Sequence, residues 1–308
     1  MNTKFKVLKP KNRTLVHTVD TSLDGTKFVI GQGSDDAGHA NLSLWTFEDF
    51  ALISELERRE NEVVLLARYS PNGKSIAYVD SALEPRLYNL EKRKSVRLNL
   101  QNRYVRWLAY AKKSDRIVVA GALTQVWDEK KSKVIWTVPG KIASRDPDVI
   151  PAVADISPDG TQIAVAGEED GSILIYNVDD GNLVQSLKGG PDHARWVSFD
   201  PLGRYVAAIE WYSHGTYLWD VQSGKMYLSD IFNSEAETYW CLRFHPDGNH
   251  LALGMLSGYV VMIKLDDGEF VIDQKAHKGR VWDLAFTPNG KYMVSGGEDG
   301  IVCIWDLE

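Results

Sequence analysis

Two stretches of the sequence group side chains that could do chemistry. Gly167–Gly171 offers three carboxylates within five residues. Gly31–His39 is rich in glycine and holds two aspartates and a histidine, which are possible metal ligands. Glycines that cradle a phosphate open a helix, whereas these lead into the strand-like run Asn41–Trp45. One histidine and two aspartates in a loop are weak grounds for a metal, so we predict a long surface loop over Gly31–His39.

The carboxylate-rich stretch recurs later in the chain, which favours a structural role. Gly297–Gly300 occupies the same place in its own repeat, so Gly167–Gly171 is interpreted as a turn. No Ser-His-Asp or Cys-His set follows from residue spacing. The two cysteines, Cys241 and Cys303, lie in apolar strand contexts that predict buried, unreactive thiols. We therefore expect no catalytic residue, no metal and no cofactor, and we predict that the protein is not an enzyme.

The turn that ends at Gly290 has relatives along the whole chain. Related turns end at Gly248, Gly203, Gly160, Gly73 and Gly25. Successive turn glycines are 42, 45, 43, 87 and 48 residues apart, and the double spacing contains a further member, Lys112–Asp115. The sequence therefore consists of seven units with a period of about 44 residues, the length of a propeller blade of four strands.

A second marker repeats in step with the turns. Each unit has one bulky residue near its end: Trp45, Tyr88, Trp127, Tyr176, Trp219, Ile263 and Trp305. We expect the four tryptophans of this set in the core. No stretch has a sustained helical period. The two markers predict an all-β, seven-bladed β-propeller that forms a single domain over residues 1–308.

The last unit lacks a strand. Its three expected strands are Arg280–Phe286, Tyr292–Gly296 and Ile301–Asp306, after which the chain stops. A three-stranded unit would leave an unpaired outer edge, which promotes aggregation. The strand-like run Lys4–Lys9 precedes the first unit and belongs to no other. We predict that this N-terminal strand completes the final blade and closes the ring.

These repeats resemble the WD40-repeat family over essentially the whole chain. The last unit carries the closest match, with Trp305-Asp306 and a Glu-Asp-Gly turn. In that family a His, a Ser or Thr, an Asp and the Trp form a hydrogen-bonded structural tetrad within a blade. The resemblance assigns these roles to His277, Ser295, Asp299 and Trp305. It also implies that a protein or peptide partner binds the top face of the propeller.

Alignment of the inner strands to the turn glycines gives candidate partner-binding residues. Aromatic and cationic side chains, enriched at binding hot spots, concentrate on blades three and five to seven, and further candidates lie in top-face turns. The set is Tyr104, Arg106, His193, Arg195, Trp240, Arg280 and Trp282, with Glu169, Trp211 and Glu298 in the turns. We expect Arg195, Trp240, Arg280 and Trp282 to be the anchors. Trp240 and Trp282 could equally fill space between blades.

Two other functions stay open at this stage. A metal-dependent propeller hydrolase or isomerase would use His17, His39 and neighbouring aspartates. Basic clusters at Glu91–Lys94, Glu129–Lys133 and Lys112–Lys113 could attract a nucleic acid or an anionic surface to the bottom rim of blades two and three. A solvated rim is the commoner reason for such clusters.

Composition limits the possible partners and the cellular compartment. The formal net charge is −7, which disfavours a nucleic-acid binder, and no apolar run approaches the roughly 18 residues of a membrane span. Two cysteines fit a reducing compartment. We expect a cytoplasmic interaction scaffold that binds a protein or peptide, alone or as a subunit of a larger complex, with no membrane and no nucleic-acid partner.

Overall fold

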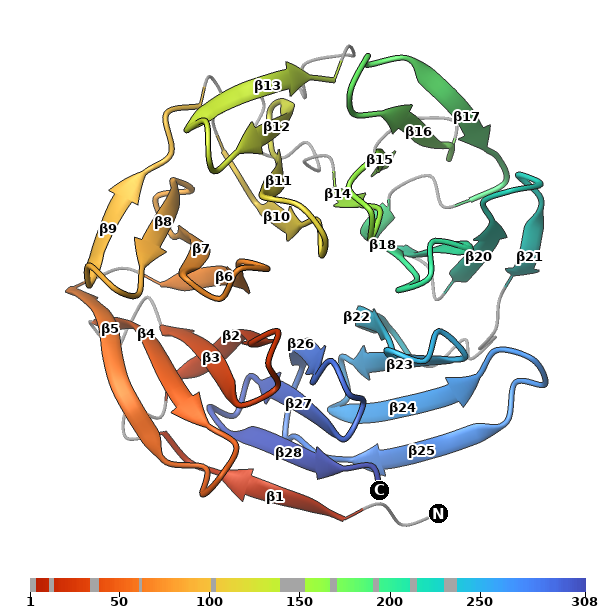
Figure 1. The fold of residues 1–308 in the computed structure, drawn as a ribbon. Coiled ribbons are helices and arrows are strands. Elements are labelled where there is room, and N and C mark those ends of the chain that lie inside the picture. The colour runs from red at the N-terminus through yellow and green to blue at the C-terminus, as the bar shows by residue number, and fades with distance from the viewer. Residues whose placement is uncertain are drawn as a thin grey trace. The chain divides into compact units, whose positions relative to one another are not determined.

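The computed structural model describes residues 4–10, 14–33, 39–60, 63–100, 104–138, 153–166, 171–190, 194–210, 215–229 and 237–308. Within these ranges the chain forms seven four-stranded sheets, or blades. Blades 1 to 6 follow the chain from inner to outer strand, and blade 7 takes its outer strand from the N-terminus. This confirms the predicted fold class of a seven-bladed, all-β propeller (Figure 1).

The bounds of the strands are as follows. Blade 1 comprises β2 (Leu15–Thr21), β3 (Lys27–Gly33), β4 (His39–Thr46) and β5 (Leu52–Glu60), and blade 2 comprises β6 (Val64–Tyr69), β7 (Ser75–Asp80), β8 (Pro85–Asn89) and β9 (Lys94–Arg97). Blade 3 comprises β10 (Trp107–Tyr110), β11 (Arg116–Ala120), β12 (Thr124–Asp128) and β13 (Lys133–Thr137), and blade 4 comprises β14 (Val153–Ile156), β15 (Gln162–Ala166), β16 (Ile173–Asn177) and β17 (Leu183–Leu187). Blade 5 comprises β18 (Ala194–Phe199), β19 (Tyr205–Glu210), β20 (Thr216–Asp220) and β21 (Met226–Ser229). Blade 6 comprises β22 (Tyr239–Phe244), β23 (His250–Met255), β24 (Tyr259–Lys264) and β25 (Phe270–Lys275). Blade 7 comprises β26 (Val281–Phe286), β27 (Tyr292–Gly297), β28 (Val302–Asp306) and β1 (Phe5–Leu8).

The chain divides into two compact units. The first unit contains residues 1–82, 88–95 and 236–308, and the second contains residues 83–87 and 96–235. Blades 1, 6 and 7 belong to the first unit and blades 3, 4 and 5 to the second. The expectation of a single domain over residues 1–308 stays a prediction. Within the described ranges there is no helix long and apolar enough to span a membrane.

The N-terminal strand completes blade 7, as predicted. β1 pairs antiparallel with β28, with Phe5 opposite Trp305 and Leu8 opposite Val302. The Phe5 ring packs on the Trp305 indole at a centroid distance of 4.5 Å. Figure 1 shows β1 as the outermost arrow of this blade, beside the chain's C-terminal strand. The edge of β28 is thereby covered.

The repeating turns explain the sequence markers. Gly290 closes the β26–β27 turn with φ of 75°, in the left-handed region where glycine is favoured, and its amide donates to the Thr287 carbonyl at 2.8 Å. The bulky marker residues are buried in the blades, with Trp219 and Trp305 fully inaccessible and Trp45 and Trp127 nearly so. The prediction that these four tryptophans are core residues is confirmed.

One expectation about Gly31–His39 was wrong. Gly31, Gln32 and Gly33 are buried residues of β3, and His39 begins β4, while residues 34–38 lie outside the described ranges. A side chain at Gly31 would clash with Thr18 Cγ2 at 2.5 Å and Val64 Cγ1 at 2.7 Å. These glycines therefore permit close packing of neighbouring inner strands, a requirement that a local loop interpretation did not consider.

Candidate functional site

Arg280, Trp240 and Trp282 form an aromatic–cationic cluster in the first unit. Trp240 lies on β22, Trp282 on β26, and Arg280 directly precedes β26. The Arg280 guanidinium carbon lies 3.8 Å from the Trp240 ring centroid and 4.6 Å from that of Trp282. The two indoles meet edge to face, with centroids 5.2 Å apart. We call these three residues the Arg280 cluster.

The cluster is held in place from two sides. The Glu298 carboxylate accepts the Arg280 amide at 3.0 Å, and the Glu298 amide donates to the Arg280 carbonyl at 2.9 Å. His17 of β2 packs on Trp282 at a centroid distance of 4.8 Å. All three side chains of the cluster remain half-buried, and Glu298 is exposed. From the sequence, His17 was predicted only as a ligand of the alternative metal-dependent enzyme and not as a contact residue.

The side chains of the Arg280 cluster suit recognition of a hydrogen-bond acceptor. Arg280 Nε and Trp282 Nε1 are buried and have no hydrogen-bond partner among the described residues. A guanidinium packed on indole faces keeps its charge and presents a planar fork that matches a carboxylate. The indoles add apolar contact area beside it. The arrangement therefore offers a paired apolar and cationic surface, with no group in the cluster that acts as a nucleophile or base.

The other predicted contact residues fall into two groups. Tyr104 and Arg106 are exposed and Arg195 is half-buried, all three in the second unit. Tyr104 has φ of 58°, an unusual backbone for a large residue, and 56% of its surface is exposed. Three further candidates, Glu169, His193 and Trp211, lie outside the described residues.

The four tetrad residues form one hydrogen-bonded chain. His277 Nδ1 lies 3.0 Å from Asp299 Oδ1 and Nε2 lies 2.9 Å from Ser295 Oγ, and Trp305 Nε1 donates to Ser295 Oγ at 3.1 Å. His277 is buried in this chain. Burial alone would raise the pKa of Asp299, but hydrogen bonds from His277 and the Lys278 amide outweigh it and lower the pKa. The tetrad geometry ties the start of blade 7 to its second and third strands.

A buried ion network joins inner strands of the first unit, and sequence reasoning missed it. Asp283 of β26 accepts from Arg68 Nη1 at 2.8 Å, Arg243 Nη2 at 3.0 Å and Thr18 Oγ1 at 2.9 Å. Asp283 is almost fully buried. Burial raises the pKa of the neighbouring Asp20, although Arg68 and Arg243 act against the rise. These charges are paired in the fold and carry no sign of catalytic use.

The described residues contain one three-residue cluster that could ligate a cation. His245 Nδ1 lies 3.0 Å from Asp247 Oδ1, and His250 Nδ1 lies 2.8 Å from Asp247 Oδ2. The same carboxylate accepts the Asn249 amide at 2.7 Å, as an aspartate does in the equivalent turn at Asp159. Burial would raise the pKa of Asp247, but its bonds lower it. Because the three side chains satisfy one another, we assign this cluster to the turn.

The basic bottom-rim segments that suggested an anionic partner are partly neutralised. Lys74 pairs with Glu91 at 3.4 Å, Lys130 with Asp115 at 2.7 Å and Lys131 with Asp128 at 3.4 Å. These ion pairs favour a solvated rim over a nucleic-acid surface.

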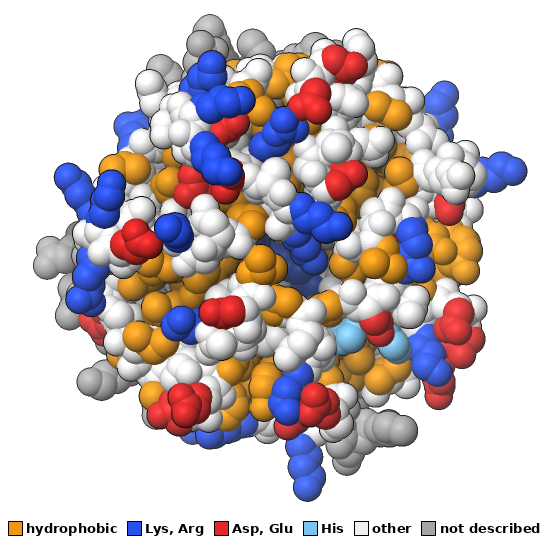
Figure 2. Space-filling model, in the orientation of Figure 1, with side chains coloured by type: hydrophobic (Ala, Val, Ile, Leu, Met, Phe, Trp, Pro, Cys, Tyr) orange, Lys and Arg blue, Asp and Glu red, His pale blue; other side chains and the backbone are white. Residues whose placement is uncertain are grey.

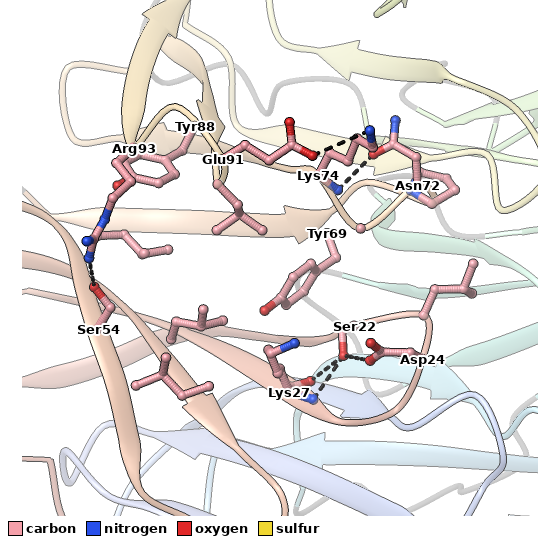
Figure 3. Close-up of a pocket in the computed structure, with 17 residues that line it drawn as sticks. Ser22, Asp24, Lys27, Ser54, Tyr69, Asn72, Lys74, Tyr88, Glu91 and Arg93 are labelled. Carbon is pink, nitrogen blue, oxygen red and sulfur yellow. Dashed lines mark hydrogen bonds and ion pairs between the residues drawn. The ribbon is translucent and has the colours of Figure 1, made fainter.

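A cavity of about 680 Å³ opens between blades 1 and 2. Its wall includes the β2–β3 turn, the β6–β7 turn and the outer parts of both blades, with Leu23, Ile53 and Leu90 among the apolar residues. The Tyr69 side chain points into this space (Figure 3). Figure 2 shows apolar side chains gathered on this side of blade 1, with basic and acidic side chains around them. We call this the Tyr69 cavity.

Comparison with known proteins supports the resemblance seen in the repeats. The family described as "WD domain, G-beta repeat" matches residues 268–306, the stretch that holds all four tetrad residues. The chain is 28% identical to Protein TEX1 of Saccharomyces cerevisiae over 117 residues, 36% of this chain and 28% of that protein. It is 26% identical to WD repeat-containing protein SL1-17 of Schistosoma mansoni over 50% of this chain and 49% of that protein. It is also 26% identical to Actin-interacting protein 1-2 of Arabidopsis thaliana over 58% of this chain and 29% of that protein.

The chain is similar to the WD40-repeat family, whose model matches residues 268–306. It covers less than two thirds of the length of these relatives. WD40 propellers are typically non-enzymatic frames for protein interaction, and this chain has that type of fold.

Proposed function

We propose that this WD40-repeat protein is a non-catalytic interaction scaffold that binds an extended, acidic segment of a protein partner through the Arg280 cluster. The observation that carries the proposal is the Arg280 guanidinium packed on two indoles from neighbouring blades. Arg and Trp are enriched at binding hot spots, and a rigid propeller presents them without an ordering cost. The partner's carboxylate would face the guanidinium, and its apolar side chains would lie on the indoles.

Two further features support an intracellular protein that works through partners. Cys241 and Cys303 are buried thiols outside any disulfide, and burial raises the pKa of Cys303 to about 12, so that thiol stays protonated and unreactive. One relative is named for interaction with actin. We take from that name only the kind of role, the binding of another protein, and propose that this chain acts alone or as a subunit of a complex.

Affinity capture with matched variants tests the proposal. The immobilised protein is incubated with extract from its native source, and the retained proteins are identified by mass spectrometry. Arg280→Lys keeps the charge but loses the planar fork, so we expect it to lose specific partners that the unaltered protein retains. Arg204→Lys is the control, because Arg204 also lies over an aromatic ring, that of Tyr205 at 5.2 Å, in another blade. Identical sets of retained proteins for all three would contradict the proposal.

A further inference from the structure

The Tyr69 cavity contains a buried hydroxyl that the described residues leave unsatisfied. Tyr69 is 93% buried, since 7% of its surface is exposed, and its hydroxyl has no hydrogen-bond partner in the described part of the chain. Burial raises the pKa of Tyr69, with Asp20 and Asp24 adding to the rise, so the hydroxyl keeps its proton and acts as a donor. A buried donor without an acceptor costs free energy, so an acceptor entering this cavity would gain from it.

The chain itself shows which group satisfies a tyrosine at this position. Tyr110 of blade 3 occupies the place that Tyr69 has in blade 2, at the end of the inner strand before the β-turn. The Tyr110 hydroxyl donates to the Glu129 carboxylate at 3.0 Å. In blade 3, therefore, the glutamate that binds the tyrosine comes from the same blade.

Blade 2 lacks that glutamate. The amide of Glu129 donates to the Asp115 carbonyl at 2.8 Å, and the amide of Leu90 makes the equivalent bond to the Lys74 carbonyl at 2.9 Å. Leu90 thus stands where Glu129 stands in blade 3, and it lines the Tyr69 cavity. Blade 2 has kept the tyrosine but has an apolar side chain in place of its acceptor.

The charges in the wall favour an anionic acceptor. Lys27 lines the cavity, and its positive charge interacts with the Asp24 carboxylate. Lys74 is paired with Glu91, and Arg93 donates to Ser54 Oγ at 3.2 Å. Asp24 is engaged in its own turn, where hydrogen bonds from Ser22 and Thr26 hold its carboxylate. The wall therefore holds three cationic side chains, Lys27, Lys74 and Arg93, against the two carboxylates Asp24 and Glu91, which leaves a net positive charge.

The rest of the lining is apolar. Leu44, Leu56, Pro71 and Tyr88 contribute to the wall, and Leu23 and Ile53 lie at the surface with about half of their area exposed. A cavity of this size and composition takes one or two aliphatic side chains together with an attached polar group.

We propose that the Tyr69 cavity binds a peptide segment of a protein partner in which an aliphatic residue precedes a glutamate, with the glutamate carboxylate accepting from the Tyr69 hydroxyl and pairing with Lys27. The carboxylate takes the role that Glu129 plays in blade 3. The Lys27 side chain is long and flexible and would turn to admit it. This site is separate from the Arg280 cluster and does not depend on it.

Peptide arrays provide the test. One set of hexapeptides has Leu-Glu fixed at its two central positions and random flanks, and the matched set has Leu-Gln. We expect the unaltered protein to bind the best Leu-Glu peptides about tenfold more tightly than their Leu-Gln partners, the effect of one charge-assisted hydrogen bond. In Tyr69→Phe this preference should disappear. Equal binding of the two sets by the unaltered protein, or a preference that persists in Tyr69→Phe, would overturn the proposal.

The variant should fold, which keeps the test decisive. Phenylalanine occupies the Tyr69 position in three other blades, at Phe199, Phe244 and Phe286. Because Tyr69→Phe removes an unsatisfied hydroxyl, its melting midpoint should equal or exceed that of the unaltered protein. Tyr110→Phe is the matched control: it removes a satisfied hydroxyl, so its midpoint should fall while the Leu-Glu preference stays. A fall in the midpoint of Tyr69→Phe similar to that of Tyr110→Phe would show that the hydroxyl is bonded within the fold, and the proposal would fail.

A second arm separates this site from the proposed function. Arg280→Lys should leave the Leu-Glu preference unchanged, since the Arg280 cluster and the Tyr69 cavity share no residue. Loss of the preference in Arg280→Lys, with Tyr69→Phe unaffected, would place the peptide at the Arg280 cluster and contradict the cavity proposal while leaving the proposed function intact.

Discussion

The Arg68 guanidinium lies 2.8 Å from the Asp283 carboxylate, although 215 residues separate the two along the chain. Both side chains are buried, and Arg243 shares the same carboxylate at 3.0 Å. Asp283 Oδ2 also accepts the Val19 amide at 3.3 Å. One aspartate of blade 7 therefore links inner strands of blades 1, 2 and 6, all within the first unit.

Replacing this aspartate should be costly. Asp283→Asn removes the carboxylate charge that is bonded to the buried guanidinium of Arg68, so we expect the free energy of unfolding to fall by about 3–5 kcal/mol. Glu269→Gln is the control, because Glu269 pairs with Lys264 at 3.0 Å on the surface and should cost no more than about 1 kcal/mol. Chemical denaturation measures both. Similar small losses in the two variants would show that the network adds little to stability.

Removal of residues 1–10 should destabilise the fold far more than loss of an ordinary tail. The deletion removes β1, exposes the edge of β28 and uncovers Trp305 where Phe5 packs on it. We expect a lower melting midpoint and a stronger tendency to aggregate. Val7→Ala provides the control, since 43% of the Val7 surface is exposed and the substitution leaves the strand pairing intact. Equal midpoints and equal solubility for the deletion and the full chain would show that β1 is dispensable.

The titration of Asp24 makes the free energy of unfolding depend on pH under acidic conditions. A hydrogen bond from Ser22, with further bonds from Thr26, lowers the pKa of Asp24 from 3.8 to about 2. A carboxyl group whose pKa is depressed in the folded state adds stability above its unfolded pKa, and that stability is lost as the pH falls through the folded value. The contribution of Asp24 should therefore disappear between about pH 4 and pH 2.

The matched variants for this prediction are Ser22→Ala and Asp24→Asn. Ser22→Ala removes the largest contribution, so the Asp24 titration, followed by carboxyl-carbon NMR, should move toward its ordinary pKa. Asp24→Asn should flatten this part of the curve of unfolding free energy against pH. A titration of Asp24 that does not change in Ser22→Ala would contradict the assigned cause.

The architecture was predictable because each blade repeats the same local chemistry. The turn at Gly290 requires a residue in the left-handed region and a side-chain hydrogen-bond acceptor. The position of Trp305 requires a bulky residue in a buried strand. Both residue patterns therefore recur in the sequence at the period of the blades. The outer strand of blade 7 was predicted by elimination, because the run Lys4–Lys9 belongs to no other unit. The interpretation of Gly31–His39 was wrong because the reason for Gly31 is contact with another blade, and such contacts have no local signature.

The sites were predictable only in part. Inner-strand register compares the same position in neighbouring blades, and of the four expected anchors Trp240, Arg280 and Trp282 contact one another, whereas Arg195 lies in the second unit. The partners of Asp283 come from three other strands, and no spacing rule connects them. The Tyr69 cavity had a signal that went unused: tyrosine at the same repeat position as Tyr110, with leucine in place of glutamate.

Trp282 offers the sharpest distinction between contact and core. A half-buried indole at a binding surface should cost at least about 2 kcal/mol of partner affinity on truncation to alanine. A fully buried one should instead cost roughly 3–5 kcal/mol of folding stability. Because Trp282 is half-buried and its Nε1 has no partner among the described residues, we expect Trp282→Ala to lose the partners retained in affinity capture, with only a small change in the melting midpoint. Trp305→Ala is the matched core control, since Trp305 is fully buried and bonded to Ser295, and its midpoint should collapse. If the melting midpoint of Trp282→Ala falls as far as that of Trp305→Ala, Trp282 belongs to the core and the partner does not bind at the Arg280 cluster.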